Sequence, residues 1–219
     1  SFINVLLIVI RLEETHKHLR QVTVKFSQSI QNIIKAASYP GLRVIFPSVF
    51  LYWAGFSFFQ TFFQVLLVNK LHFTASNIGD FFAYVGSWIA LTQAIITPLL
   101  ANRFHSYQVL RISLFLTGLG LFGTILAHNT TQLLLVTPLF AIFIGMTIAN
   151  STSLVSTSAD KHIQGEVLGI NASVQALAQS IPAALSGYLA SVGINSPVLA
   201  GGSVIILGGL LGWTLYRPE

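Results

Sequence analysis

Charged residues divide this chain into long uncharged stretches. Four stretches contain no Asp, Glu, Lys or Arg and are 26, 22, 48 and 50 residues long: 44–69, 81–102, 112–159 and 167–216. A helix rises about 1.5 Å per residue, so about 20 residues cross the ~30 Å hydrocarbon core of a bilayer. The first two stretches therefore hold one crossing each, and each of the last two holds two if a turn divides it.

Both long stretches contain a candidate turn. His128-Asn129-Thr130-Thr131 interrupts the third stretch, and Gly193-Ile194-Asn195-Ser196-Pro197 interrupts the fourth. The apolar runs are continuous rather than alternating, and only helices or closed barrels satisfy every backbone group in lipid. The pattern therefore predicts an all-α membrane protein with six transmembrane helices, at 44–68, 78–101, 108–127, 132–156, 166–191 and 197–216.

The composition supports a membrane protein and excludes several classes. Only 8% of the 219 residues are charged, against roughly 25% in soluble domains, and the mean hydropathy is +0.75. The chain has no Cys, which excludes disulfides and cysteine nucleophiles. No cofactor, metal site or enzymatic activity is expected, because no span centre carries an acid or His and the loop histidines form no ligand spacing: His72, His105, His128 and His162.

The basic residues predict the orientation. If the chain before the first span is cytoplasmic, ten of the eleven basic residues lie on that side and only Lys70 lies outside. The ten are Arg11, Lys17, Arg20, Lys25, Lys35, Arg43, Arg103, Arg111, Lys161 and Arg217. The net charge of +5 is thus a topology signal, and no nucleic-acid partner is expected. We expect an integral protein of the plasma (inner) membrane with a cytoplasmic C-terminus and a short tail at 217–219.

The first 43 residues predict two further segments. Residues 1–10 are apolar but too short to span a bilayer, and we interpret them as the truncated end of a preceding transmembrane helix. Residues 11–43 predict a cytoplasmic linker, in which apolar residues at helical spacing favour an amphipathic helix over a loosely ordered segment: Phe26, Ile30, Ile33, Ile34 and Ala37. The chain therefore reads as the C-terminal piece of a longer membrane protein, with the six spans at 44–216.

Asn and Gln are distributed unevenly among the six spans. They occur in spans one, two, four and five, whereas span six has none and span three has only Gln108, at its first residue. Polar side chains in membranes usually face a bundle interior or an aqueous cavity, so spans three and six are expected to face lipid. The repeated order of polar, polar, apolar predicts two inverted three-helix repeats.

The amides also align along helix faces. Trp53, Ser57, Gln60 and Gln64 form a first-span stripe, and Asn171, Gln175 and Gln179, each four residues apart, form an amide ridge on the fifth span. The alternatives are hydrogen bonds between helices and the lining of a substrate cavity. The candidate substrate-binding residues are Trp53, Phe56, Ser57, Gln60, Gln64, Gln93, Asn150, Asn171, Gln175 and Gln179. Asp80, near the outer end of the second span, is either an acid favourable to the helix dipole or a proton site.

Three short segments at span ends carry a family resemblance. They are Leu12-Glu13-Glu14-Thr15, then Pro98-Leu99-Leu100-Ala101-Asn102-Arg103-Phe104, and Gln164-Gly165-Glu166-Val167-Leu168-Gly169. In this order they resemble the Leu-Pro-Glu-Thr, Gly…Asp-Arg loop and Gln-Gly-x-x-x-Gly motifs of the major facilitator superfamily, in its drug–proton antiporter group with tetracycline-exporter-like members. The first lacks its Pro, and Pro98 and Asn102 replace the Gly and Asp of the second.

The resemblance implies a mechanism. Two six-helix halves of a twelve-helix fold would rock about a central site, with Asn102 and Arg103 in a gating loop and the coupling acids in a missing N-terminal six-helix half. The expected function is proton-coupled efflux of a small organic substrate by alternating access, as in multidrug resistance. A nutrient importer of the same fold and a six-helix channel or scaffold remain the alternatives.

Overall fold

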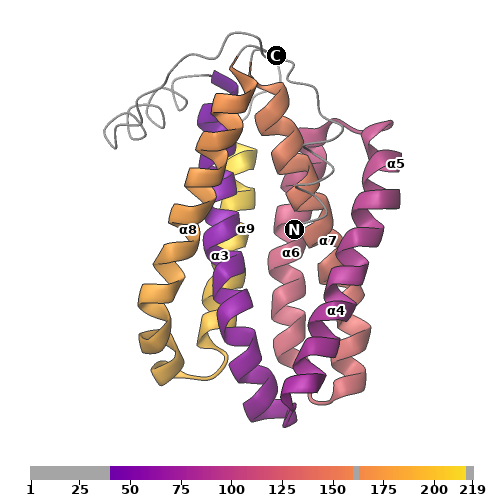
Figure 1. Cartoon of the computed structure of the whole chain (residues 1–219), viewed down its shortest axis with the longest axis vertical. Helices are drawn as coiled ribbons and strands as arrows, with labels where there is room; N and C mark the ends of the chain where they lie inside the picture. The colour runs from indigo at the N-terminus through magenta and orange to yellow at the C-terminus, as the bar shows by residue number, and fades with distance from the viewer. Residues whose placement is uncertain (1–39, 160–162, 216–219) are drawn as a thin grey trace, which may run out of the picture.

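Six long helical segments follow one another along the chain in the computed structural model, which describes residues 40–159 and 163–215 (Figure 1). They are α3 (Pro40–Leu71), the continuous run of α4 (Ala75–Leu91), η1 (Thr92–Ile96) and α5 (Thr97–Ala101), then α6 (Ser106–Leu126), α7 (Thr130–Thr157), α8 (Gln164–Val192) and α9 (Ser196–Leu215). The described residues form no strand. Each segment lies within four residues of a predicted span at both ends, so the predicted all-α fold is confirmed over the described residues.

Five of these segments are long and apolar enough to cross a membrane: Ile45–Leu71, Ala75–Ala101, Ser106–Leu126, Thr130–Thr157 and Ser196–Trp213. The fifth predicted span, α8, is not among them. It has 29 residues, but Asn171, Gln175, Gln179 and Glu166 lower its hydropathy. The predicted apolar stub at 1–10, the linker up to residue 39 and the tail at 217–219 lie outside the described residues.

Local signals set the helix boundaries. His72 adopts a left-handed backbone conformation with a φ of 54°, which ends α3. Thr74 then caps α4, because its hydroxyl accepts the N–H of Asn77 at 3.3 Å and the Asn77 side chain accepts the N–H of Thr74 at 3.0 Å. Asn129 caps α7 by accepting the N–H of Gln132 at 2.8 Å, which confirms the predicted turn there.

Replacing Thr74 with alanine should lower the free energy of unfolding by about 1 kcal/mol, because the Asn77 N–H at the start of α4 loses its acceptor, the Thr74 hydroxyl. Thermal unfolding in detergent, followed by circular dichroism, measures the change. Thr131→Ala, at an exposed position in the first turn of α7, is the matched control. Equal effects of the two variants would contradict the capping role.

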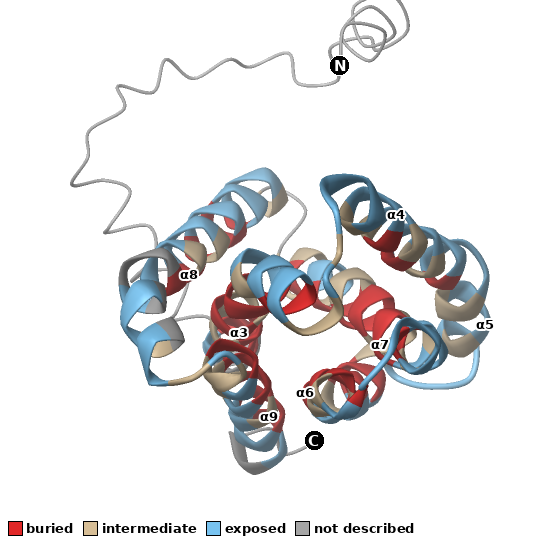
Figure 2. Ribbon diagram, turned by 90° about the horizontal axis from the view of Figure 1, so that it is seen from below, coloured by how far each residue is buried: buried red, intermediate tan, exposed pale blue. Residues whose placement is uncertain are grey.

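The helix α9 lies between α3 and α6 and packs closely against both (Figure 2). Two Gly-Gly pairs seven residues apart make this approach possible. A Cβ atom on Gly201 would lie 2.6 Å from the carbonyl oxygen of Gly55 in α3, and one on Gly118 of α6 would lie 2.7 Å from that of Gly202. Gly208 meets α3 and Gly209 meets α6 in the same way, one heptad later. Small residues at such positions allow two membrane helices to approach closely.

The structure refines the expectation that spans three and six lie at the periphery. Half of the most apolar part of α6 is buried, against 11% for the segment containing α4. Both α6 and α9 pack against two neighbours and keep one apolar side exposed: Ile112, Phe115, Leu119 and Leu126 on α6, and Leu199, Leu207, Leu210, Leu211 and Trp213 on α9. They are thus structural helices with a lipid-compatible outer side, while α4 and α8 stand at the edges of the bundle (Figure 2).

A π-helical turn interrupts the second span. The N–H of Thr97 bonds to the carbonyl of Thr92, five residues earlier, directly before Pro98. A proline ring clashes with the carbonyl four residues before it, and the wider turn relieves that clash. Thr92 is fully buried against Gly145 of α7, where a Cβ atom would lie 2.9 Å from the Thr92 Cβ. The turn therefore shifts the register of side chains between α4 and α5, and it does so where Thr92 packs against Gly145 of α7.

Candidate functional site

Viewed along the helices, α3 and α7 lie in the middle of the bundle with α8 and α4 on either side (Figure 2). These are the four spans that carry the amides. The candidate site is built on them, from the first-span stripe on α3 and the amide ridge on α8. Both helices begin at the same end of the bundle and run in the same direction, so residues at similar depth face each other (Figure 1).

The stripe on α3 changes from buried to exposed along its length. Trp53 and Phe56 are half-buried and pack edge to face, with ring centroids 5.9 Å apart. Ser57 is buried, whereas Gln60 and Gln64 are exposed on the bundle surface. The structure thus places an aromatic wall beside two accessible amides on one helix.

The amide ridge on α8 lies on the side that packs against α3. Asn171 is buried, Gln175 and Gln179 are half-buried, and the Ser57 hydroxyl donates to the main-chain carbonyl oxygen of Gln179 at 3.3 Å. The small residues Ala172, Ala176 and Ser180 of the same helix are exposed. The amides and not the small residues therefore turn towards the neighbouring helix.

The remaining two amides lie apart from this pair of helices. Asn150 on α7 is 5% exposed, and its side-chain N–H donates to the Met146 carbonyl of its own helix at 2.8 Å. Gln93 is exposed within the π-helical turn. The Asn150 side chain therefore bonds within its own helix, whereas the Gln93 side chain is exposed on the surface of the second span.

Three buried polar atoms on α3 and α8 have no hydrogen-bond partner among the described residues. They are the Tyr52 hydroxyl, the Trp53 indole Nε1 and the Asn171 side-chain oxygen. Buried polar groups are usually paired, so these are places where water or a polar ligand group would be stabilised. Tyr52 was missed in the sequence analysis, which counted only Asn and Gln; its position next to Trp53 in an apolar span was the available signal.

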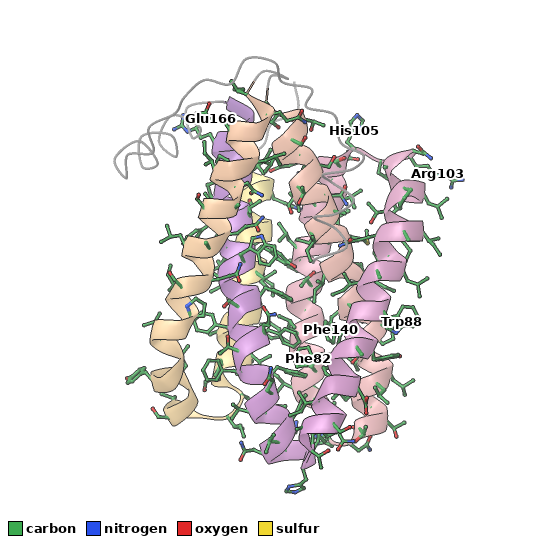
Figure 3. The ribbon with its side chains drawn as sticks, in the orientation of Figure 1. Phe82, Trp88, Arg103, His105, Phe140 and Glu166 are labelled. Atoms are coloured by element: carbon green, nitrogen blue, oxygen red, sulfur yellow. The ribbon has the colours of Figure 1, made fainter. Side chains whose placement is uncertain are left out.

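The other predicted residues lie at the two ends of the bundle. Asn102 and Arg103 are exposed in the turn after α5, at the same end as Glu166 (Figure 3). Asp80 is exposed at the opposite end and lines a cavity of about 490 Å³ with His72 and Tyr84. The structure does not bring Asp80, Asn102 or Arg103 together with the amides. The described residues contain no group of three or more His, Cys, Asp or Glu placed to hold a metal.

The candidate site on α3 and α8 carries little charge. The charged residues in the described ranges are Arg43, Lys70, Asp80, Arg103, Arg111 and Glu166, each within six residues of a helix end or in a turn. The amides and aromatic rings therefore lie in neutral surroundings. Such a surface can bind amphipathic molecules through ring contacts and adaptable hydrogen bonds.

Two sequence comparisons match this chain to known proteins. The profile described as Major Facilitator Superfamily matches residues 45–219. Over 205 residues, 93% of the chain, the sequence is 26% identical to "Multidrug resistance protein 2" of Bacillus subtilis (strain 168). The aligned part covers 50% of that protein, so the chain spans about half the length of the curated relative it matches.

Proposed function

Because this chain belongs to the major facilitator superfamily, we propose that it forms one six-helix half of a secondary active transporter that exports small organic solutes. Membership places the chain among membrane transport proteins and not among enzymes. The name of the Bacillus subtilis relative, a multidrug resistance protein, supports efflux as the direction. A second six-helix half would complete the twelve-helix fold, in which the two halves are parallel repeats and each half contains two inverted three-helix repeats.

The observation that carries the proposal is the neutral surface of amides and aromatic rings on α3 and α8. Amides bind both donors and acceptors, and rings bind apolar surface, so a range of amphipathic molecules would fit. The absence of nearby charge among the described residues favours neutral or weakly charged solutes over anions and strong cations. Trp53, Phe56, Gln60, Gln64, Gln175 and Gln179 would make the contacts, with Ser57, Gln93, Asn150 and Asn171 around them.

Proton coupling and alternating access are part of the same proposal. No described span has an acid near its centre, so the coupling carboxylates would lie in the other half, and Asp80 would act at most at the outer mouth. The clustering of Arg43, Arg103 and Arg111 at one end favours a cytoplasmic location for that end. In an inner membrane this arrangement would place the C-terminus in the cytoplasm.

Transport by inside-out vesicles tests the proposal. Vesicles that contain both halves should accumulate at least one of tetracycline, ethidium and Nile red more than vesicles without the protein, and a protonophore should abolish the difference. Accumulation by right-side-out vesicles instead would identify an importer. Steady conductance without saturable counterflow would identify a channel, and no uptake of any probe in either orientation would contradict the proposal.

A further inference from the structure

Arg111 is a charged side chain inside a predicted membrane span. It is the sixth residue of α6, about 7.5 Å along the axis from Ser106, which corresponds to the boundary between headgroups and hydrocarbon. Ionised groups at such positions are costly unless something pairs with them, and they usually mark a site. In the sequence, Arg111 serves only as one of the basic residues that predict the orientation.

Two aromatic rings hold the Arg111 guanidinium. Its central carbon lies 5.4 Å from the ring centroid of Tyr107 and 5.4 Å from that of Trp213 on α9. Ring faces attract the positive charge but do not satisfy the five N–H donors of the guanidinium as a carboxylate would. The Arg111 Nε is buried without a hydrogen-bond partner among the described residues. The two rings thus fix the position of the Arg111 side chain, and its Nε–H has no acceptor among the described residues.

An apolar groove of about 400 Å³ opens beside this guanidinium. Its lining residues come from the end of α5 and the turn after it, from α6 and from α7. Leu100, Phe104, Ile112 and Met146 line its apolar part, and Gln108 and Arg111 supply its polar groups. None of the described residues that line it is Asp or Glu. Ile112 and Phe104 are 51% and 52% exposed, so the groove is open on the outer side of the bundle.

We propose that this groove binds one anionic phospholipid of the leaflet on the α5–α6 turn side. The phosphate would accept hydrogen bonds from Arg111 and Gln108, and an acyl chain would lie along Phe104, Ile112 and Met146. The charge favours an anion, the apolar walls favour a chain of methylenes, and the depth of Arg111 matches a phosphodiester. Basic pockets between membrane helices on the cytoplasmic side recognise lipid headgroups in this way. The proposal requires only that the chain lies in a membrane, not that it exports solutes.

Native mass spectrometry of the whole chain in detergent tests this site. The chain is titrated with phosphatidylglycerol and, separately, with phosphatidylcholine of the same acyl chains. The wild type should prefer phosphatidylglycerol, and Arg111→Gln should weaken its binding about fivefold to tenfold and remove the preference. Ile112→Trp, which fills the groove from an exposed position, should weaken binding of both lipids. Arg103→Gln, a loss of one exposed charge at the same end outside the groove, should change binding less than about twofold.

Three outcomes would overturn the proposal. The first is wild-type affinity for phosphatidylglycerol in Arg111→Gln. The second is an equal loss in Arg103→Gln, which would show attraction by surface charge alone. The third is displacement of the lipid by millimolar inorganic phosphate, which would identify a free anion as the ligand. If Arg111→Gln does not fold, Ile112→Trp decides, because unchanged lipid binding in that variant also overturns the proposal.

Discussion

Replacing Gly201 with valine should prevent stable packing of α9 on α3 and lower the free energy of unfolding by about 3 kcal/mol. The Cβ atom alone would lie 2.6 Å from the Gly55 carbonyl oxygen and 3.2 Å from the Phe58 Cβ. A backbone oxygen cannot move aside as a flexible side chain can, so the two helices must separate. Separation would also loosen the contact of α9 with α6, because the neighbouring Gly202 packs against Gly118.

Unfolding of the purified chain by SDS in mixed micelles measures this effect. Gly86→Val is the matched control, since a Cβ atom at Gly86 of α4 meets nothing within 4 Å. The control should unfold at nearly the wild-type SDS concentration. If Gly201→Val were as stable as Gly86→Val, this would contradict the close packing of α9 against α3 at Gly201.

Replacing Gln64 or Gln175 with leucine should reduce transport about tenfold, because each amide would lose a hydrogen bond to the solute. Gln64 is exposed and Gln175 is half-buried, and no hydrogen bond to another part of the protein is recorded for either side chain in the described structure. Stability should therefore change by less than about 0.5 kcal/mol. Initial rates of probe uptake by inside-out vesicles, normalised to protein content, measure the first effect, and thermal unfolding measures the second.

Asn69→Leu is the control for these variants. Asn69 is also exposed on α3, but its amide donates to the Val65 carbonyl of its own helix at 2.8 Å, and it lies near the end of the helix. Transport by this variant should remain near the wild-type rate. Normal transport by both Gln64→Leu and Gln175→Leu would remove α3 and α8 from the proposed substrate site.

The helices could be predicted from the sequence because charged residues and turn-forming residues lie at the ends of the apolar runs. Arg43, Lys70, Arg103 and Glu166 each lie near a helix end, and Asn129 marks the turn between α6 and α7. The π-helical turn could not be predicted in the same way. It depends on Pro98 and on the contact of Thr92 with Gly145, which lies on another helix.

The site was harder to predict because counting amides does not show where each amide points. On α8, Asn171 is buried and Gln175 and Gln179 are half-buried, and the hydrogen bond between this helix and Ser57 of α3 is made by the main-chain carbonyl of Gln179 and not by its amide. Asn150, however, bonds to its own helix, and Tyr52 and Trp53 supply buried donors that the count ignored. Arg111 shows the same limit, since its two ring partners lie on α6 and α9 and only tertiary packing brings Trp213 to it.

The glycine contacts of α9 also bear on the order of assembly in the cell. The chain is synthesised from its N-terminus, so α3 and α6 enter the bilayer before α9 exists. The surfaces of α3 at Gly55 and of α6 at Gly118 are then in contact with lipid or with the insertion machinery until α9 has been inserted and packs between them. A chain truncated before residue 196 would lack α9, and the surfaces of α3 and α6 that pack against it would stay exposed. We expect membrane quality-control proteases to degrade such a truncated chain.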